Sequence, residues 1–183
     1  MTCLLGIVEG NTMYLGADSV GANDHYKEVR RDSKIFRKRD MLIACTHSFR
    51  MRDIIRYDFE LPEHSEGMSV EKYMVTIFIN KLREKLKECG HIKKDNDGDA
   101  GCGLLIAYRG KILKIENDFQ VGQSKDDYDA YGSGTYCALC SLFTSSYYDI
   151  KPEERMRLAF ESCRRFVKGC CAPPYKIKKL KWR

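Results

Sequence analysis

Residues 1–18 of the chain read Met1-Thr-Cys-Leu-Leu-Gly-Ile-Val-Glu-Gly-Asn-Thr-Met-Tyr-Leu-Gly-Ala-Asp18. Two apolar runs, Cys3 to Val8 and Met13 to Ala17, flank a polar turn around Gly10, and this pattern predicts a β-hairpin. The stretch lacks the composition of a secretory leader. The sequence therefore predicts a strand that starts immediately after Thr2.

Thr2 is the residue of this stretch that could act as a nucleophile. If Met1 is removed, Thr2 has a hydroxyl nucleophile and a free α-amine on one residue. A free α-amine has a pKa of about 7.7–8.0, so a useful fraction is neutral near pH 7 and can accept the hydroxyl proton. If Met1 is retained, Thr2 has no free amine. Position alone favours the reading that Thr2 is simply the second residue of an ordinary protein.

Four short motifs follow Thr2 along the chain. They are Gly16-Ala-Asp18, Ser33-Lys34, Ile43-Ala44 and Tyr131-Gly-Ser133-Gly. In order and spacing, Thr2 and these motifs resemble the β-type subunits of proteasomes and, most of all, their small bacterial relative, the HslV peptidase. Each motif alone is weak evidence, so the resemblance depends on their joint spacing over nearly the whole chain.

The order of the predicted elements agrees with the fold that this resemblance implies. Hairpins, two helices, a hairpin, two more helices and a closing strand predict the α+β class, with antiparallel sheets covered by helix layers. The resemblance implies a four-layer α-β-β-α sandwich, the fold of the N-terminal-nucleophile (Ntn) hydrolases. At 183 residues, we expect a single domain that spans residues 1–183.

Hydrophobic periodicity and turn residues give the expected boundaries of the other elements. The expected extended segments are 28–36, 41–46, 102–108, 111–115, 129–131 and 176–183. The expected helices are 49–59 capped by Ser48, a second one from Ser69 to Gly90, 135–148 capped by Ser133, and a last one from Pro152 to Gly169 with Leu158 among its buried residues. Residues 93–99 are expected to be a polar loop, because the acidic spacing there lacks the glycine and glutamate of a calcium loop.

The resemblance implies a role for each matching residue of the site. Thr2 would be the nucleophile, and Lys34 beside it would favour the alkoxide and lower the proton affinity of the amine. Asp18 would pair with Lys34 and orient it, because an uncompensated buried lysine is costly. Ser133 would hydrogen-bond the α-amine or a bridging water. Without the resemblance, Lys34 would be one more charge in a basic strand and Ser133 an ordinary helix N-cap.

The position of the oxyanion donor differs from the family pattern. In these enzymes a backbone N–H from a glycine after an Ile-Ala pair stabilises the oxyanion. Here Ile43-Ala44 is followed by Cys45. The backbone N–H of Cys45 remains the expected donor, and its side chain would narrow the adjoining pocket.

A second departure lies near the end of the chain. The family usually has an Asp-x-x-Ser element near the end of the last helix, which supports the N-terminal amine. Residues 165–183 contain no Asp and no Ser, and Cys170 and Cys171 stand about where that element is expected. The resemblance therefore implies the fold more strongly than it implies activity.

The sequence supports two main hypotheses of function. The first is a threonine-type peptidase subunit of a self-compartmentalising ring protease, which would cleave unfolded proteins or peptides. The second is a catalytically inactive proteasome-like subunit with a structural or assembly role, and a small-molecule amidase is a weaker third reading. The resemblance also implies a ring-forming homo-oligomer and an ATP-dependent unfoldase partner.

Composition narrows the remaining possibilities. The net charge of +6 is concentrated in residues 27–39 and 176–183, and the alternation of lysines with apolar residues in the second stretch predicts an edge strand instead of a nucleic-acid site. No apolar run approaches the roughly 20 residues that a membrane span needs. Nine cysteines without a leader predict reduced thiols and a cytoplasmic location. We expect no cofactor and no metal. Zinc at Cys137-x-x-Cys140, with Cys163, Cys170 and Cys171 later in the chain, is only an outside possibility, because a zinc site needs four converging ligands.

Overall fold

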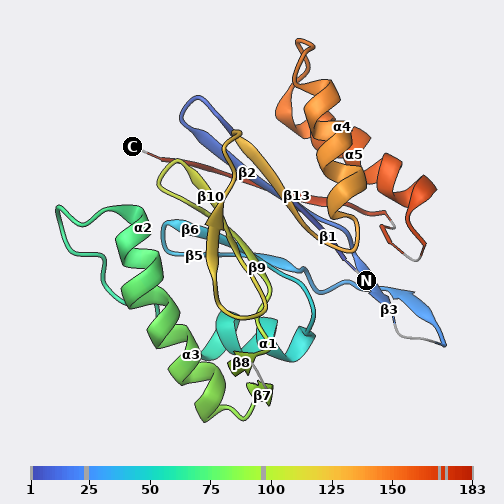
Figure 1. The fold of residues 1–183 in the computed structure, drawn as a ribbon. Helices are drawn as coiled ribbons and strands as arrows, with labels where there is room; N and C mark the ends of the chain where they lie inside the picture. Colours follow the sequence, from blue (N-terminus) through green and yellow to red (C-terminus); the bar gives the residue numbers. More distant parts are fainter. Residues whose placement is uncertain (1, 23–24, 96–97, 169, 172, 183) are drawn as a thin grey trace.

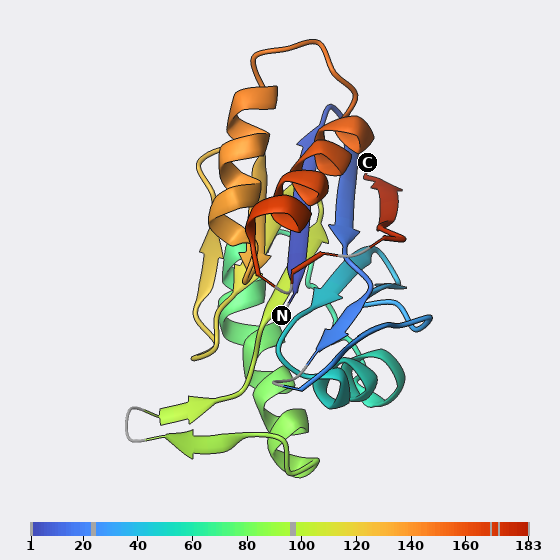
Figure 2. The ribbon, with the colours of Figure 1, turned by 90° about the vertical axis from the view of Figure 1, so that its right-hand side faces the viewer.

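Two antiparallel sheets pack face to face, and helices cover the outer face of each, as the computed structural model in Figures 1 and 2 shows. The structure describes the whole chain except residues 1, 23–24, 96–97, 169, 172 and 183. This four-layer arrangement confirms the predicted α+β fold class. Gly169, the expected stop of the last helix, lies outside the described residues.

The first sheet contains the hairpin predicted at the start of the chain. Its strand order is β12 (Tyr128–Gly132), β1 (Cys3–Glu9), β2 (Thr12–Ala17) and β13 (Lys176–Lys181). All neighbouring pairs are antiparallel. The basic stretch near the end of the chain is therefore the predicted edge strand, and it pairs with β2.

The second sheet is built from two hairpins and one short strand. Its order is β11 (Val121–Gln123), β10 (Lys111–Ile115), β9 (Leu104–Tyr108), β6 (Met41–Cys45) and β5 (Ile35–Lys38). The β5–β6 and β9–β10 hairpins were both predicted from apolar runs that adjoin charged turns. The sequence analysis missed β11, which is only three residues long.

Two further hairpins correct the sequence analysis. The strands β3 (Val20–Ala22) and β4 (Lys27–Val29) pair with each other, and β4 ends before residue 30. The expected continuous extended segment 28–36 is therefore wrong, and residues 30–34 form a connection to β5. Residues 93–100 contain β7 (Lys93–Asp95) and β8 (Gly98–Ala100) instead of the expected loop.

The helices form two groups on opposite sides of the molecule (Figure 1). The helices α4 (Thr135–Ser145) and α5 (Pro152–Phe166) cover the first sheet. The second sheet is covered by α1 (Phe49–Asp53), α2 (Val70–Lys72) and α3 (Ile79–Glu88) with the π-helical segments η1 (Ile54–Asp58) and η2 (Tyr73–Phe78).

The helix caps agree with the sequence analysis at two of three places. The hydroxyls of Ser48 and Ser69 each accept a backbone hydrogen bond in the first turn of the following helix, as expected. Ser133 does not cap α4, because Gly134 occupies the N-cap position. Leu158 was expected in the core but is 38% exposed, and the buried face of α5 instead includes Cys163.

The strand β1 is buried on both of its faces. Leu4 points into the layer between the sheets, whereas Cys3 and Leu5 pack under α4 and α5. The buried residues of the layer between the sheets are Leu4, Met13, Leu15, Ala17, Ile35, Leu42, Ala44, Leu105, Ala107 and Ile112. Because β1 belongs to both cores, Thr2 immediately before it is held by packing on two sides.

Candidate active site

Three polar side chains meet at the start of β1. The Lys34 Nζ atom lies 3.0 Å from Thr2 Oγ1 and 2.9 Å from Asp18 Oδ1. All three residues are buried, with 6% of Thr2, 4% of Lys34 and 1% of Asp18 exposed. In this environment the Lys34 ammonium is compensated by the Asp18 carboxylate and donates a hydrogen bond to the Thr2 hydroxyl.

The carboxylate of Asp18 is fixed by backbone groups as well as by Lys34. Its Oδ1 accepts a hydrogen bond from the Cys3 N–H at 2.9 Å, and its Oδ2 accepts one from the Val20 N–H at 3.1 Å. Asp18 directly follows β2, so the predicted hairpin places it beside the first residues of β1. These contacts hold the carboxylate in the position from which it orients Lys34.

Ser133 lies on the other side of Thr2. The Thr2 backbone nitrogen is 3.0 Å from Ser133 Oγ and donates to it, and Ser133 Oγ is 3.2 Å from the Thr2 carbonyl oxygen. The preceding Gly132 has φ = +104°, and a Cβ atom there would lie 2.3 Å from that carbonyl oxygen. A glycine is therefore required for β12 to approach Thr2 so closely.

Cys45 is the expected oxyanion donor, and its N–H already has a partner. It donates to the Lys34 carbonyl at 3.0 Å, as a continuation of the β5–β6 pairing. A role for this N–H toward a substrate requires that it be shared with, or released from, the Lys34 carbonyl. The assignment of Cys45 to the oxyanion hole therefore stays a prediction.

A small cavity of about 110 Å³ opens beside Thr2. Its wall includes Lys34, Cys45, His47 and Arg52. His47 has φ = +66°, an uncommon conformation for a residue other than glycine, and its ring packs edge-on to Tyr131 at 5.9 Å between centroids. Burial lowers the pKa of His47, so its imidazole is neutral near pH 7.

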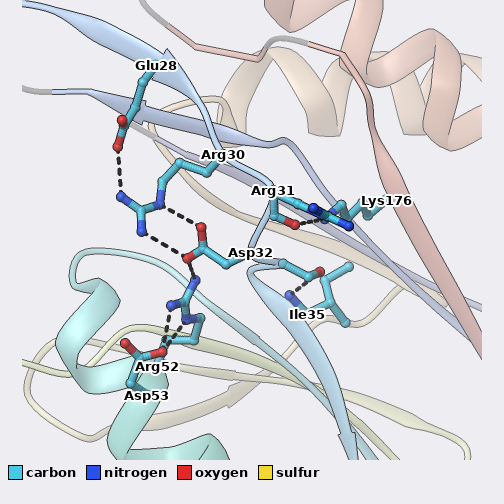
Figure 3. Close-up of polar contacts among 9 residues, drawn as sticks. Glu28, Arg30, Arg31, Asp32, Ile35, Arg52, Asp53 and Lys176 are labelled. Carbon is cyan, nitrogen blue, oxygen red and sulfur yellow. Dashed lines mark hydrogen bonds and ion pairs between the residues drawn. The ribbon is translucent and has the colours of Figure 1, made fainter.

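Arg52 in the wall of the cavity belongs to a network of charged groups (Figure 3). Arg52 is 5% exposed and contacts the carboxylates of Asp32 and Asp53. Arg30 pairs with Asp32 at 3.0 Å and with Glu28 at 2.7 Å. Burial alone would raise the pKa of Asp32, but hydrogen bonds from Arg30 and Arg52 outweigh it and hold that pKa well below its usual range. Arg52 therefore enters the cavity wall with its charge compensated.

His47 and Arg52 were not predicted from the sequence to be part of the site. On sequence alone, Arg52 is a charge within a short helix, and His47 is a lone histidine in a turn. Only the tertiary fold brings them to Thr2. By contrast, the structure brings together all four side chains that the sequence analysis named: Thr2, Asp18, Lys34 and Ser133.

Comparisons of the whole chain with solved structures identify the fold. The BPH protein of Thiobacillus denitrificans in complex with epoxomicin superimposes with a TM-score of 0.83 at 21% identity, covering 99% of both chains. The chain has a proteasome-like Ntn hydrolase fold. Eukaryotic HslV from Trypanosoma brucei gives a TM-score of 0.64 at 15% identity over 98% of this chain and 99% of that protein.

A third solved structure with a similar fold comes from another bacterial protein. Anbu (ancestral beta-subunit) from Yersinia bercovieri gives a TM-score of 0.65 at 12% identity, covering 98% of this chain and 81% of that protein. No protein-family model and no curated protein sequence matches the chain. Among the described residues, no helix has the length and apolarity required to cross a membrane.

Proposed function

We propose that this chain is an N-terminal threonine peptidase, in which the hydroxyl of Thr2 attacks the peptide bond after Met1 has been removed. The observation that carries the proposal is the position of the Lys34 ammonium, 3.0 Å from Thr2 Oγ1 and 2.9 Å from Asp18 Oδ1. A buried, paired ammonium beside a hydroxyl stabilises negative charge on that oxygen. A purely structural role for Lys34 does not require this contact.

The proposed reaction uses the two functional groups of Thr2. The neutral α-amine takes the proton from Oγ1 as Oγ1 attacks the scissile carbonyl, and Lys34 stabilises the charge that develops on Oγ1. When the tetrahedral intermediate collapses, the C–N bond breaks and the α-ammonium gives its proton to the leaving amine. Water then attacks the ester on Thr2, with the α-amine again acting as the base. The second product leaves as a carboxylic acid, and Thr2 is regenerated.

Ser133 positions the attacking residue in this proposal. Its hydroxyl lies between the Thr2 nitrogen and the Thr2 carbonyl oxygen, so it restricts rotation of the residue about both groups. Once the nitrogen is a free amine, a hydrogen bond with Ser133 directs its lone pair toward Oγ1. We therefore assign Ser133 a positioning role, and Thr2 and Lys34 the chemical roles.

The proposed substrates are unfolded proteins or peptides, and the proposed assembly is a ring of identical chains in the cytoplasm served by an ATP-dependent unfoldase. Likeness of fold to HslV and Anbu supports self-association. The cavity beside Thr2 is small, at about 110 Å³, which favours a modest side chain next to the cleaved bond.

The alternative is a proteasome-like subunit without catalysis. Two observations favour it: the Cys45 N–H is bound to the Lys34 carbonyl, and residues 165–183 contain no Asp or Ser that could support the amine. An inactive subunit still needs a compensated Lys34 for stability, so the pairing with Asp18 fits both alternatives. The contact with Thr2 Oγ1 is the feature that favours the enzyme.

One experiment separates these alternatives. Intact mass of the purified protein reports whether Met1 is removed, and a mixture of fluorogenic peptides reports hydrolysis. We expect loss of activity in Thr2→Ala, partial activity in Thr2→Ser, and wild-type activity in Thr12→Ala as a control on a distant threonine. A peptide electrophile, or epoxomicin as the ligand found in the similar BPH structure, should add its mass to residue 2 of the wild type. Equal hydrolysis by wild type and Thr2→Ala, or full activity with Met1 retained, would refute the proposal.

A further inference from the structure

Four buried cysteines gather directly behind the candidate active site. They are Cys3 on β1, Cys163 on α5, and Cys170 and Cys171 in the segment after α5. Each is 2% exposed or less. Cys3 lies 160 residues from Cys163, so the fold brings thiols from two distant parts of the chain together, which core packing by small residues alone does not require.

Three of the four sulfur atoms lie close enough to one another to share a single metal ion, and the fourth, on Cys163, adjoins that of Cys3. The Sγ atoms of Cys3 and Cys163 are 3.8 Å apart, and those of Cys170 and Cys171 are 3.2 Å apart. The sulfurs of Cys3, Cys170 and Cys171 all lie within 4.8 Å of one another. In a tetrahedral zinc site with Zn–S bonds of about 2.3 Å, neighbouring sulfurs are about 3.8 Å apart. The observed sulfur–sulfur distances, from 3.2 Å to at most 4.8 Å, include this value.

The surroundings of the cluster favour thiolates. The cluster lies at the N-terminus of α4, where the helix dipole stabilises negative charge. A Cβ atom at Gly134, the N-cap of α4, would lie 2.9 Å from the Cys3 sulfur and 3.1 Å from the Cys170 sulfur, so glycine leaves room for them.

We propose that four cysteines form a structural binding site for a thiophilic divalent cation, preferentially zinc. They are Cys3, Cys163, Cys170 and Cys171. Binding displaces the remaining thiol protons to solvent and forms four metal–sulfur bonds, with no change of oxidation state. The site would be closed, because four protein ligands complete a tetrahedron. The proposal departs from the expectation of a chain without metal, and its ligands do not include the Cys137-x-x-Cys140 pair.

The proposed ion would connect the end of the chain to the nucleophile. Cys3 is bonded to Thr2, and Cys170 lies near Ser133, whose hydroxyl contacts the Thr2 nitrogen. Cys170 and Cys171 also occupy the part of the sequence where an Asp-x-x-Ser element was expected. The metal would thus hold two neighbours of Thr2 in place: Cys3 directly, as a ligand, and Ser133 through its contact with Cys170. The inference itself does not depend on peptidase activity.

The test measures metal in the purified full-length protein, without reference to hydrolysis. We expect one zinc per chain by elemental analysis, and after exchange the absorption of tetrahedral cobalt(II) with a sulfur-to-metal charge-transfer band. The double variant Cys170→Ser Cys171→Ser should lose at least nine-tenths of the metal and of the cobalt spectrum. Cys102→Ala, a buried cysteine outside the cluster, and Cys137→Ser, beside Cys163, should keep both.

A second measurement covers the case in which a variant does not fold. The reduced wild type is stripped with a chelator and titrated with zinc alone while its melting temperature is followed. We expect stoichiometric uptake and a rise of at least about 5 °C, because zinc that binds only the folded state stabilises it. A wild type that contains no zinc and neither binds it nor gains stability would overturn the proposal. Loss of metal in Cys137→Ser would overturn the assigned ligand set.

Discussion

At the scale of single residues, the pairing of Lys34 with Asp18 supports both the fold and the proposed chemistry. Asp18 is the acceptor for Lys34 and for the N–H groups of Cys3 and Val20. Loss of its charge would leave the Lys34 ammonium buried without compensation. Breaking a buried ion pair on one side typically costs about 3–5 kcal/mol.

We therefore expect Asp18→Asn to lower the free energy of unfolding by about 3–5 kcal/mol, measured by urea denaturation. The double variant Asp18→Asn Lys34→Met removes both charges and should recover part of this loss, but it should not react with a peptide electrophile. An Asp18→Asn protein as stable as the wild type would show that this carboxylate does not compensate Lys34.

A second expectation at this scale concerns the backbone next to Thr2. Gly132 has φ = +104°, and a Cβ atom added there would lie only 2.3 Å from the Thr2 carbonyl oxygen, whereas at Gly122 the nearest atom is 3.9 Å away. We expect Gly132→Ala to cost at least about 2 kcal/mol and to abolish labelling of Thr2, because the added methyl group pushes Ser133 and Thr2 apart. Gly122→Ala is the matched control and should stay within about 1 kcal/mol of the wild type. Equal stabilities for the two variants would contradict this account.

At the scale of elements, the arginine–carboxylate network joins the connection before β5 to helix α1. Arg30 and Asp32 lie in that connection, and Arg52 lies on α1 (Figure 3). The same connection carries Lys34 to Thr2. The network therefore fixes a segment without regular structure in the position that the candidate site needs.

The lowered pKa of Asp32 gives this network a pH dependence with a definite sign. A carboxyl group whose pKa is lower in the folded state stabilises the fold above its unfolded pKa of about 3.9, and this contribution is lost as the pH falls below that value. We expect Asp32→Asn to reduce the free energy of unfolding at pH 7, and the difference from the wild type to shrink below about pH 4. Asp40→Asn, at a carboxylate that is 59% exposed and 3.9 Å from Arg109, is the control and should have a smaller effect. A difference that grows on acidification would contradict the assignment.

Which elements could be predicted from the sequence depended on whether their signals were local. The β1–β2, β5–β6 and β9–β10 hairpins have apolar runs around short polar turns, and all three were predicted. The β7–β8 hairpin was missed because its charged and glycine-containing residues carry no strand signal. Ser133 was a plausible cap on local grounds, but its hydroxyl contacts Thr2, 131 residues away.

The candidate site divides in the same way. Thr2, Asp18, Lys34 and Ser133 could be named because their spacing resembles a known family. Arg52 and His47 could not, since their place in the cavity wall follows from how α1 and β6 pack against the first residues of β1. The four-cysteine cluster was not predicted as a group, because Cys3 lies 160 residues before Cys163 and only the fold brings them together.

At the scale of the whole molecule, the strand β13 closes the first sheet. Its backbone pairs with β2 over six residues, and Trp182 packs against Gly110 of the second sheet's β9–β10 turn. The strand thereby covers the edge of β2, which would otherwise offer unpaired backbone groups to other chains. Its exposed Lys178 and Lys179 discourage further pairing at the new edge.

We expect a chain truncated after Tyr175 to melt several degrees lower and to form irregular aggregates, because β2 becomes an uncovered edge. Size-exclusion chromatography with light scattering and a thermal melt measure the two effects. The control Lys87→Gln Lys125→Gln changes two exposed lysines outside β13, keeps the strand and should remain monodisperse. A truncated chain that behaves like the wild type would mean that β13 contributes little to the sheet.

The wide sequence separation of the groups around Thr2 determines when, during folding, the candidate site is assembled. Lys34 lies 32 residues from Thr2 and Ser133 lies 131 residues from it, and β1 is packed only when both sheets have formed. An emerging or misfolded polypeptide has the threonine but none of its surroundings. Under the proposed function, peptide-bond hydrolysis would thus begin only in copies whose two sheets have both formed.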